Sequence, residues 1–215
     1  MGRAATSSQV VTSSDRTVSY IEAGDGVPVV LLHGIGSGAR SWKAQFQDLS
    51  DRFRVVAWDA PGYGTSTPLT PPKPIAREYA DAVSEFVRAL DVERFHLVGH
   101  SLGSLIAARY AADHPERLMS LTLASIASGH AMHTPEERAR LREGRLSILA
   151  ELGPRGMAEK RGPALLSSAA TDAMRQSVIE TMAAIQPSGY RQAVFLLSGG
   201  DTRADVLRLP MDLPV

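Results

Sequence analysis

The stretch Val98-Gly99-His100-Ser101-Leu102-Gly103 decides the fold. An apolar run precedes it at residues 94–98 and small residues dominate 105–112, so the sequence predicts a strand that turns sharply into a helix at Ser101. A turn this tight presses the residues two before and two after the serine against neighbouring backbone, which explains the two glycines. The hydroxyl is then exposed at a helix N-terminus, where free N–H groups favour negative charge. The pattern predicts Ser101 as a nucleophile; the alternative is a plain tight turn.

A second glycine-rich loop, His33-Gly34-Ile35-Gly36-Ser37-Gly38, follows the apolar run at residues 27–32. Acyl transfer requires two N–H donors aimed at the developing oxyanion. We expect the amides of Leu102 and Ile35 to supply them, with Gly34 and Gly36 letting the backbone turn inward. The predicted supporting residues are His33, Gly34, Gly36, Gly99, His100 and Gly103. The alternative is a strand-to-helix loop without such a role.

The same loop also matches a dinucleotide-binding pattern through Gly34, Gly36 and Ala39, with Asp59 at the end of the next predicted strand. The hairpin-like segments upstream, His33 before the first glycine and the independent serine turn weigh against this interpretation. An NAD(P)-binding oxidoreductase is kept as a remote alternative. The loop at residues 59–66 is predicted to be structural, because its glycines and proline stiffen it and Asp59 can accept backbone N–H bonds.

The order of predicted elements indicates an α/β fold. Two short β-branched segments at 9–14 and 17–22 are typical of an antiparallel hairpin. Strands and helices then alternate, with strands expected at 27–32, 53–58, 94–98 and 118–124, and helices at 40–49, 75–90 and 102–113. Such alternation predicts a mostly parallel, doubly wound sheet with helices on both faces.

The character of the sequence changes after Ser125. Thr134-Pro135-Glu136-Glu137 is a good helix start, and helical stretches continue to about residue 197 without another convincing strand. We therefore expect a core at residues 1–125, a helical lid at 126–200 and a return towards the core at 201–215. The methionines of the lid are predicted mainly as core filler, with a flexible substrate-facing surface as the alternative: Met132, Met157, Met174 and Met182.

Composition excludes several classes of function. Lys+Arg and Asp+Glu balance at 23 each, so the net charge gives no electrostatic attraction to nucleic acid or to an anionic membrane. The absence of cysteine removes disulfides and thiolate chemistry and suits a reducing compartment, and we expect no metal and no cofactor. With no secretory signal or membrane-spanning run, a cytoplasmic protein is expected. Gly2 and Thr6 formally match a myristoylation pattern, but a polar tail is the preferred interpretation.

Three motifs in order resemble the α/β-hydrolase family: H-G-x-G at residues 33–36, D-x-P-G-x-G-x-S at 59–66 and V-G-H-S-L-G at 98–103. The similarity runs from about residue 16 to the end and is nearest in type to small serine esterases and lactonases similar to 3-oxoadipate enol-lactonase. Members that resemble haloalkane dehalogenases or epoxide hydrolases carry aspartate at the serine position, so Ser101 excludes that mechanism here. The family order of nucleophile, acid and histidine implies that the last two follow later strands, beyond Val215.

No histidine in the chain is well placed as a substitute base. His33 belongs to the oxyanion loop, His96 alternates into the sheet, His100 points away from its neighbour, and His114 lies at the far end of the helix after Ser101. His130 and His133 lie nearer the expected pocket mouth but are interpreted as solvated lid residues. The positions after residues 118–124 hold Ser125, Ile126 and Ala127, so an acid is absent there as well.

The sequence thus predicts a serine hydrolase that cleaves a small, largely apolar ester or lactone through an acyl-enzyme on Ser101. The alternatives are a non-catalytic ligand-binding protein, or a carbon–carbon bond hydrolase or thioesterase on the same core. Since the strand at residues 118–124 is expected to be an uncovered apolar edge, we also expect a homo-oligomer, a swapped assembly or a longer protein.

Overall fold

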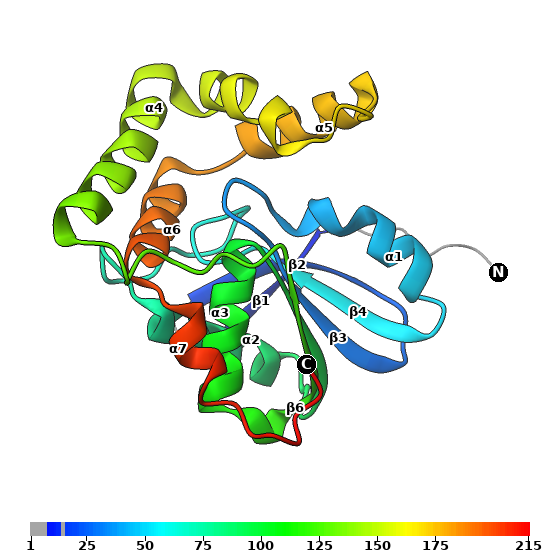
Figure 1. Cartoon of the computed structure of the whole chain (residues 1–215). Coiled ribbons are helices and arrows are strands. Elements are labelled where there is room, and N and C mark those ends of the chain that lie inside the picture. The colour runs from blue at the N-terminus through cyan, green and yellow to red at the C-terminus, as the bar shows by residue number, and fades with distance from the viewer. Residues whose placement is uncertain (1–7, 14–15) are drawn as a thin grey trace.

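The computed structural model describes residues 8–13 and 16–215 and contains one mixed sheet in the order β1-β2-β4-β3-β5-β6 (Figure 1). β1 pairs antiparallel with β2 and β2 with β4, whereas the other neighbours are parallel. The strands are β1 Ser8–Ser13, β2 Arg16–Ala23, β3 Val27–Leu32, β4 Phe53–Trp58, β5 Phe95–His100 and β6 Leu118–Ala124. The predicted hairpin and the predicted parallel sheet are confirmed. The turn of the hairpin at 14–15 and the predicted tail at Gly2 and Thr6 lie outside the described residues.

The strand order reverses at β3. The chain passes from β3 through η1 (Ala39–Trp42) and α1 (Lys43–Leu49) to β4 on one side, then through α2 (Ala76–Ala89) to β5 on the other side. The chain therefore leaves the neighbouring strands β3 and β5 towards opposite faces of the sheet at their carboxyl ends. In open α/β sheets a crevice for ligands forms at this point.

Alternation along the strands divides the core between two faces. Val30, Leu32 and Leu97 pack with α2 and with α3 (Leu102–Asp113). Val29 and Leu31 pack with η1 and α1 on the opposite face. Because β3 is buried on both faces, its sequence is continuously apolar instead of alternating.

The first four helical elements after β6 lie over the carboxyl edge of the sheet (Figure 1). They are α4 Pro135–Arg161, η3 Pro163–Leu165, α5 Asp172–Ala183 and α6 Pro187–Gly199. The helix start predicted at residue 134 is confirmed, since Thr134 and Glu137 form a capping box. α4 is broken at Gly153, which has φ 63° and precedes Pro154. The domain boundaries and the role of this segment as a lid stay predictions.

The helical segment is fixed to the core mainly through α6. The Gln192 side chain accepts a hydrogen bond from Leu69 N (3.1 Å) and donates to the carbonyls of Leu69 (2.6 Å) and Pro71 (2.9 Å). Gly189 packs backbone against backbone on Gly62, since a Cβ on Gly189 would lie 2.0 Å from Gly62 O. These contacts hold the start of α6 against the loop that follows β4.

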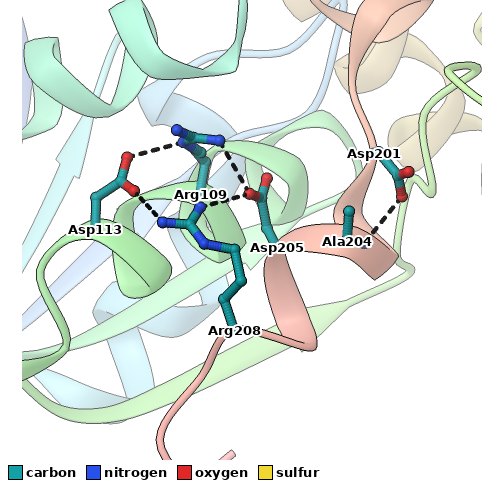
Figure 2. A network of polar contacts seen from close by, with 6 residues as sticks. All are labelled: Arg109, Asp113, Asp201, Ala204, Asp205 and Arg208. Atoms are coloured by element: carbon teal, nitrogen blue, oxygen red, sulfur yellow. Dashed lines mark hydrogen bonds and ion pairs between the residues drawn. The ribbon is translucent and has the colours of Figure 1, made fainter.

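The chain then returns to the core through α7 (Thr202–Val206), which lies against α3. Figure 2 shows the ionic network that joins them: Arg109 contacts Asp113 (2.8 Å) and Asp205 (3.2 Å), and Arg208 contacts the same two carboxylates at 2.9 and 3.3 Å. Burial alone would raise the pKa of Asp113, but hydrogen bonds from Arg208 and Arg109 hold it below its ordinary value. Two arginines bridging two carboxylates fasten α7 along the helix that follows Ser101.

The last residues lie beside β6, which follows the short turn η2 (Pro115–Arg117). Leu121 N donates to Pro214 O at 2.9 Å, and Leu213 packs against the core. The expectation of a bare edge at β6 is therefore wrong in part, because the return segment forms a backbone bond there. Over the described residues, no helix combines the length and apolar character needed to cross a bilayer.

Candidate active site

Ser101 occupies a strained backbone conformation between β5 and α3. Its φ and ψ are 52° and −116°, a region that costs a residue with a Cβ about 1–3 kcal/mol. The conformation is held from both sides of the residue. Ser101 N donates to Ala124 O at 3.0 Å, and Ser101 O accepts from Ser104 N at 2.9 Å. The half-buried side chain therefore stands at the N-terminus of α3, as the sequence predicts.

The glycines beside Ser101 are required by close backbone contacts. A Cβ on Gly99 would lie 2.4 Å from Gly103 O, and a Cβ on Gly103 would lie 2.1 Å from Leu32 O. The packing reason inferred for these glycines from the sequence is thus confirmed. The same contact brings the end of β3 against the first turn of α3.

The loop that follows β3 lies directly beside Ser101. A Cβ on Gly34 would lie 3.1 Å from Ser101 Cβ and 3.2 Å from His100 Nδ1. Gly36 has φ 72°, so the backbone reverses its direction after Ile35. In the described part of the chain, neither Ile35 N nor Leu102 N donates to a protein acceptor. The two expected oxyanion donors therefore come from the loop after β3 and from the first residue of α3, and their catalytic role stays a proposal.

His33 joins the loop after β3 to the loop after β4. Its ring is 3% exposed, Nδ1 lies 2.8 Å from Gly34 O, and Nε2 accepts from Ala60 N at 3.0 Å. Because an N–H faces Nε2, the bond to the Gly34 carbonyl assigns the proton to Nδ1. Burial lowers the pKa of His33, so the imidazole is neutral. With both nitrogens occupied, His33 holds the two loops together.

Asp59 is bound within the chain. Its carboxylate accepts from Ala39 N and from the Ser19 hydroxyl, both at 2.8 Å. The structural role predicted for this loop agrees with these contacts. The dinucleotide alternative loses support, because the acidic residue of that motif binds the ribose and the Asp59 carboxylate is already bonded within the chain.

Two further histidines of the sheet have partners away from Ser101. His96 Nδ1 lies 2.7 Å from the Ser120 hydroxyl. His100 packs edge-on against Trp42 with ring centroids 6.2 Å apart, and burial lowers its pKa. These placements follow the alternation along β5.

The remaining histidines lie at the end of α3 and in the segment between β6 and α4. His114 caps the far end of α3 and packs on Tyr110. His130 and His133 pack on each other with centroids 5.4 Å apart, and burial lowers the pKa of His130. Taken over the described residues, no hydrogen bond or ion pair joins a histidine or a carboxylate to the Ser101 side chain.

Met182 of the helical segment contacts the candidate site. Nothing in the sequence distinguishes it in this respect from the other methionines of the segment. The three atoms nearest to a Cβ on Gly36 all belong to Met182, the closest at 3.3 Å. Met157 and Met182 are buried, but Met132 and Met174 are 83% and 56% exposed. The prediction of core filler is therefore wrong for the last two, and no periodicity in the sequence distinguishes the pairs.

The chain belongs to the alpha/beta hydrolase fold family, because the family model matches residues 27–174. Two of the curated relatives that it matches are hydrolases. Over 104 residues it is 36% identical to the (E)-2-((N-methylformamido)methylene)succinate hydrolase of Acinetobacter baylyi, covering 48% of this chain and 39% of that protein. Over 135 residues it is 33% identical to the 2-hydroxy-6-oxo-6-phenylhexa-2,4-dienoate hydrolase of Comamonas testosteroni, covering 60% of this chain and 47% of that protein.

Solved structures show the same fold. An esterase from Exiguobacterium antarcticum superposes with a TM-score of 0.81 at 20% identity, over 95% of this chain and 78% of that chain. The enol-lactonase from Burkholderia xenovorans gives 0.76 at 19% identity, over 94% and 78%. The alignments to the two hydrolase relatives thus span less than half of those proteins' length, whereas the structural matches span about three quarters.

Proposed function

We propose that the protein is a serine hydrolase that cleaves a carboxylic ester or lactone through Ser101. Its Oγ attacks the carbonyl carbon while a base removes the proton, and the amides of Ile35 and Leu102 hold the oxyanion. Collapse of the intermediate expels the alcohol, which takes up a proton. Water then releases the acyl group from Ser101.

The observation that carries this proposal is the positive φ of Ser101 beside the Gly34 loop. A residue with a Cβ is held in such a conformation only where its surroundings determine it, and such strain clusters at functional sites. The family assignment adds support, since two of the matched relatives are hydrolases. The proposal assigns a nucleophile and two oxyanion donors but no base. Without a base the rate falls by several powers of ten, so slow turnover by this chain is expected.

Two apolar side chains beside the loop after β3 support a substrate class for this proposal. Met182 covers the Gly36 side, and Ile35 is a partly buried apolar residue packed against the core. These side chains favour a small, largely uncharged acyl group. A carbon–carbon bond hydrolase or thioesterase would use the same serine and is separated from an esterase by substrate profiling.

Covalent labelling tests the proposal. The protein is treated with a fluorophosphonate and its intact mass is measured, with Ser101→Ala as the control. We expect one adduct per chain, on the peptide that contains Ser101, and none in the variant. Because no base is assigned, labelling is followed over many hours. A Ser101 peptide that stays unmodified throughout marks a non-catalytic binding protein instead.

A further inference from the structure

Two buried hydroxyls hold the same residue from opposite sides. Ala127, in the segment that leaves β6, donates its N–H to Ser104 Oγ at 3.1 Å. Its carbonyl accepts from Thr202 Oγ1 at 2.6 Å. Ser104 is fully buried and Thr202 is 2% exposed. A side-chain hydroxyl therefore satisfies each backbone polar group of Ala127.

The Ser104 hydroxyl also reaches the candidate nucleophile. Ser104 Oγ donates to Ser101 O at 2.5 Å, beside the bond from Ser104 N to the same carbonyl. A hydroxyl has one proton, and here it is directed at Ser101 O while a lone pair receives the N–H of Ala127. The position of that carbonyl is set by ψ of Ser101, which is −116°. Ser104 thus links the strained residue to the segment after β6.

Thr202 forms the other end of the path, where the helical segment returns to the core. Its N–H donates to Ser128 O at 3.1 Å, and its hydroxyl bonds to Ala127. Close by, a Cβ on Gly129 would lie 1.9 Å from Gly200 O, so the segment that leaves the core and the segment that returns to it are in contact. We call residues 127–131 and 199–202 the neck of the helical segment.

We propose that Ser104 and Thr202 are positioning residues for Ser101: they form one hydrogen-bonded path from the strained serine to the neck. The inference deepens the proposed serine hydrolase and rests on it. Contact between the two segments of the neck then fixes the Ser101 backbone. The Ser101 hydroxyl and the helices above the site thereby keep the same relative position. Packing does not require either hydroxyl, since alanine and valine have nearly the shapes of serine and threonine.

The experiment compares the rate of fluorophosphonate labelling per folded molecule. Ser104→Ala and Thr202→Val remove one hydroxyl each, and Thr202→Ser restores the second. Thr181→Val is the matched control, because Thr181 Oγ1 donates to Ser177 O at 2.8 Å on the exposed side of α5. We expect labelling about tenfold slower in the first two variants, a modest share of the ~100-fold that a 1 Å misplacement costs. Thr202→Ser and Thr181→Val stay within twofold of the parent protein.

The double variant and amide exchange separate positioning from mere stability. Since both hydroxyls act on Ala127, the double variant is expected to label no more slowly than the slower single variant. Thr202→Val is also expected to speed hydrogen exchange at Ser104 N, which bonds to Ser101 O. If the parent protein is never labelled, the proposed function fails, and exchange alone decides the inference. Labelling and Ser104 exchange that match those of Thr181→Val would overturn it.

Discussion

The loops at the carboxyl edge of the sheet and the α4–α5 arm above them are built in opposite ways. Around Ser101 the backbone is close-packed, so that a Cβ on Gly99 or Gly103 would meet a backbone oxygen within 2.4 Å. On α4, a Cβ on Gly144 or Gly153 would meet nothing within 4 Å. The glycines of the loops are thus required by backbone contacts, whereas Gly144 and Gly153 of the arm face open space.

Polar contacts differ in the same sense. The loops use buried partners, such as His33 between Gly34 and Ala60. The arm uses an exposed pair, in which Arg155 contacts both oxygens of Glu180 at 2.9 and 2.8 Å. Solvent weakens such a pair but not a buried hydrogen bond. The geometry of the candidate site is therefore set by the core, and the arm is the region in which change is tolerated.

The largest expected difference is between two glycine-to-alanine substitutions. Gly103→Ala forces Leu32 O and the first turn of α3 apart and is expected to cost about 3 kcal/mol or more of unfolding free energy. Gly144→Ala in exposed helix is expected to gain about 0.5–1 kcal/mol. Urea unfolding of both variants measures the difference. Equal effects at the two sites would show that the contrast drawn here is wrong.

A second comparison uses two glutamines. Gln192→Leu leaves Leu69 N and two carbonyls without partners in a buried place, so a loss of about 2–3 kcal/mol is expected. Gln176→Leu is the control, since its amide bonds to Glu180 on the exposed face of α5. Thermal unfolding of both proteins is the measurement. A silent Gln192→Leu would mean that α6 is not fixed by this side chain.

The pH dependence of stability tests the buried imidazole. Burial holds the pKa of His33 below 6.5, so the unfolded chain takes up a proton at higher pH than the folded chain does. The contribution of neutral His33 to the free energy of unfolding is therefore complete above about pH 6.5. It is lost as pH falls through the folded pKa of His33, at up to about 1.4 kcal/mol per pH unit. His33→Gln should flatten the curve of unfolding free energy between pH 5 and 7. A parallel curve would contradict this assignment.

The smallest expected effect belongs to the exposed pair of the arm. Arg155→Ala removes two hydrogen bonds to Glu180, yet both side chains are about half exposed. We expect no measurable change in the thermal midpoint or in the labelling rate of Ser101. A clear loss of stability would show that the arm is held more tightly than its contacts indicate.

The sequence predicts the core well because the core obeys local rules. The strands at 27–32, 53–58 and 118–124 are observed with those bounds. Burial on both faces leaves β3 and most of β4 apolar, whereas Ser120 and Thr122 interrupt the apolar residues of β6 at the sheet edge. The glycines around Ser101 were also assigned correctly, because a sharp turn has a fixed steric requirement. The helix predicted at 40–49 is instead split into η1 and α1, a detail that no pattern in the sequence marks.

The contacts that complete the candidate site lie outside the reach of pattern analysis. Met182 reaches Gly36 from far along the chain, and Ala127 is held by Ser104 and Thr202 from two separate helices. Such pairings depend on tertiary packing, which periodicity does not encode. The partly covered edge at β6 has the same origin, because a single bond between Leu121 and Pro214 produces it.

Trapping the acyl group tests the central claim most directly. The protein is mixed with a p-nitrophenyl ester of a short fatty acid, quenched in acid and digested. The mass of the peptide that carries residue 101 is then measured by mass spectrometry. If the strained Ser101 is the nucleophile, the acyl group is found on Ser101 and is lost in Ser101→Ala. Acylation elsewhere, or an unmodified peptide at full release of p-nitrophenol, would contradict the account.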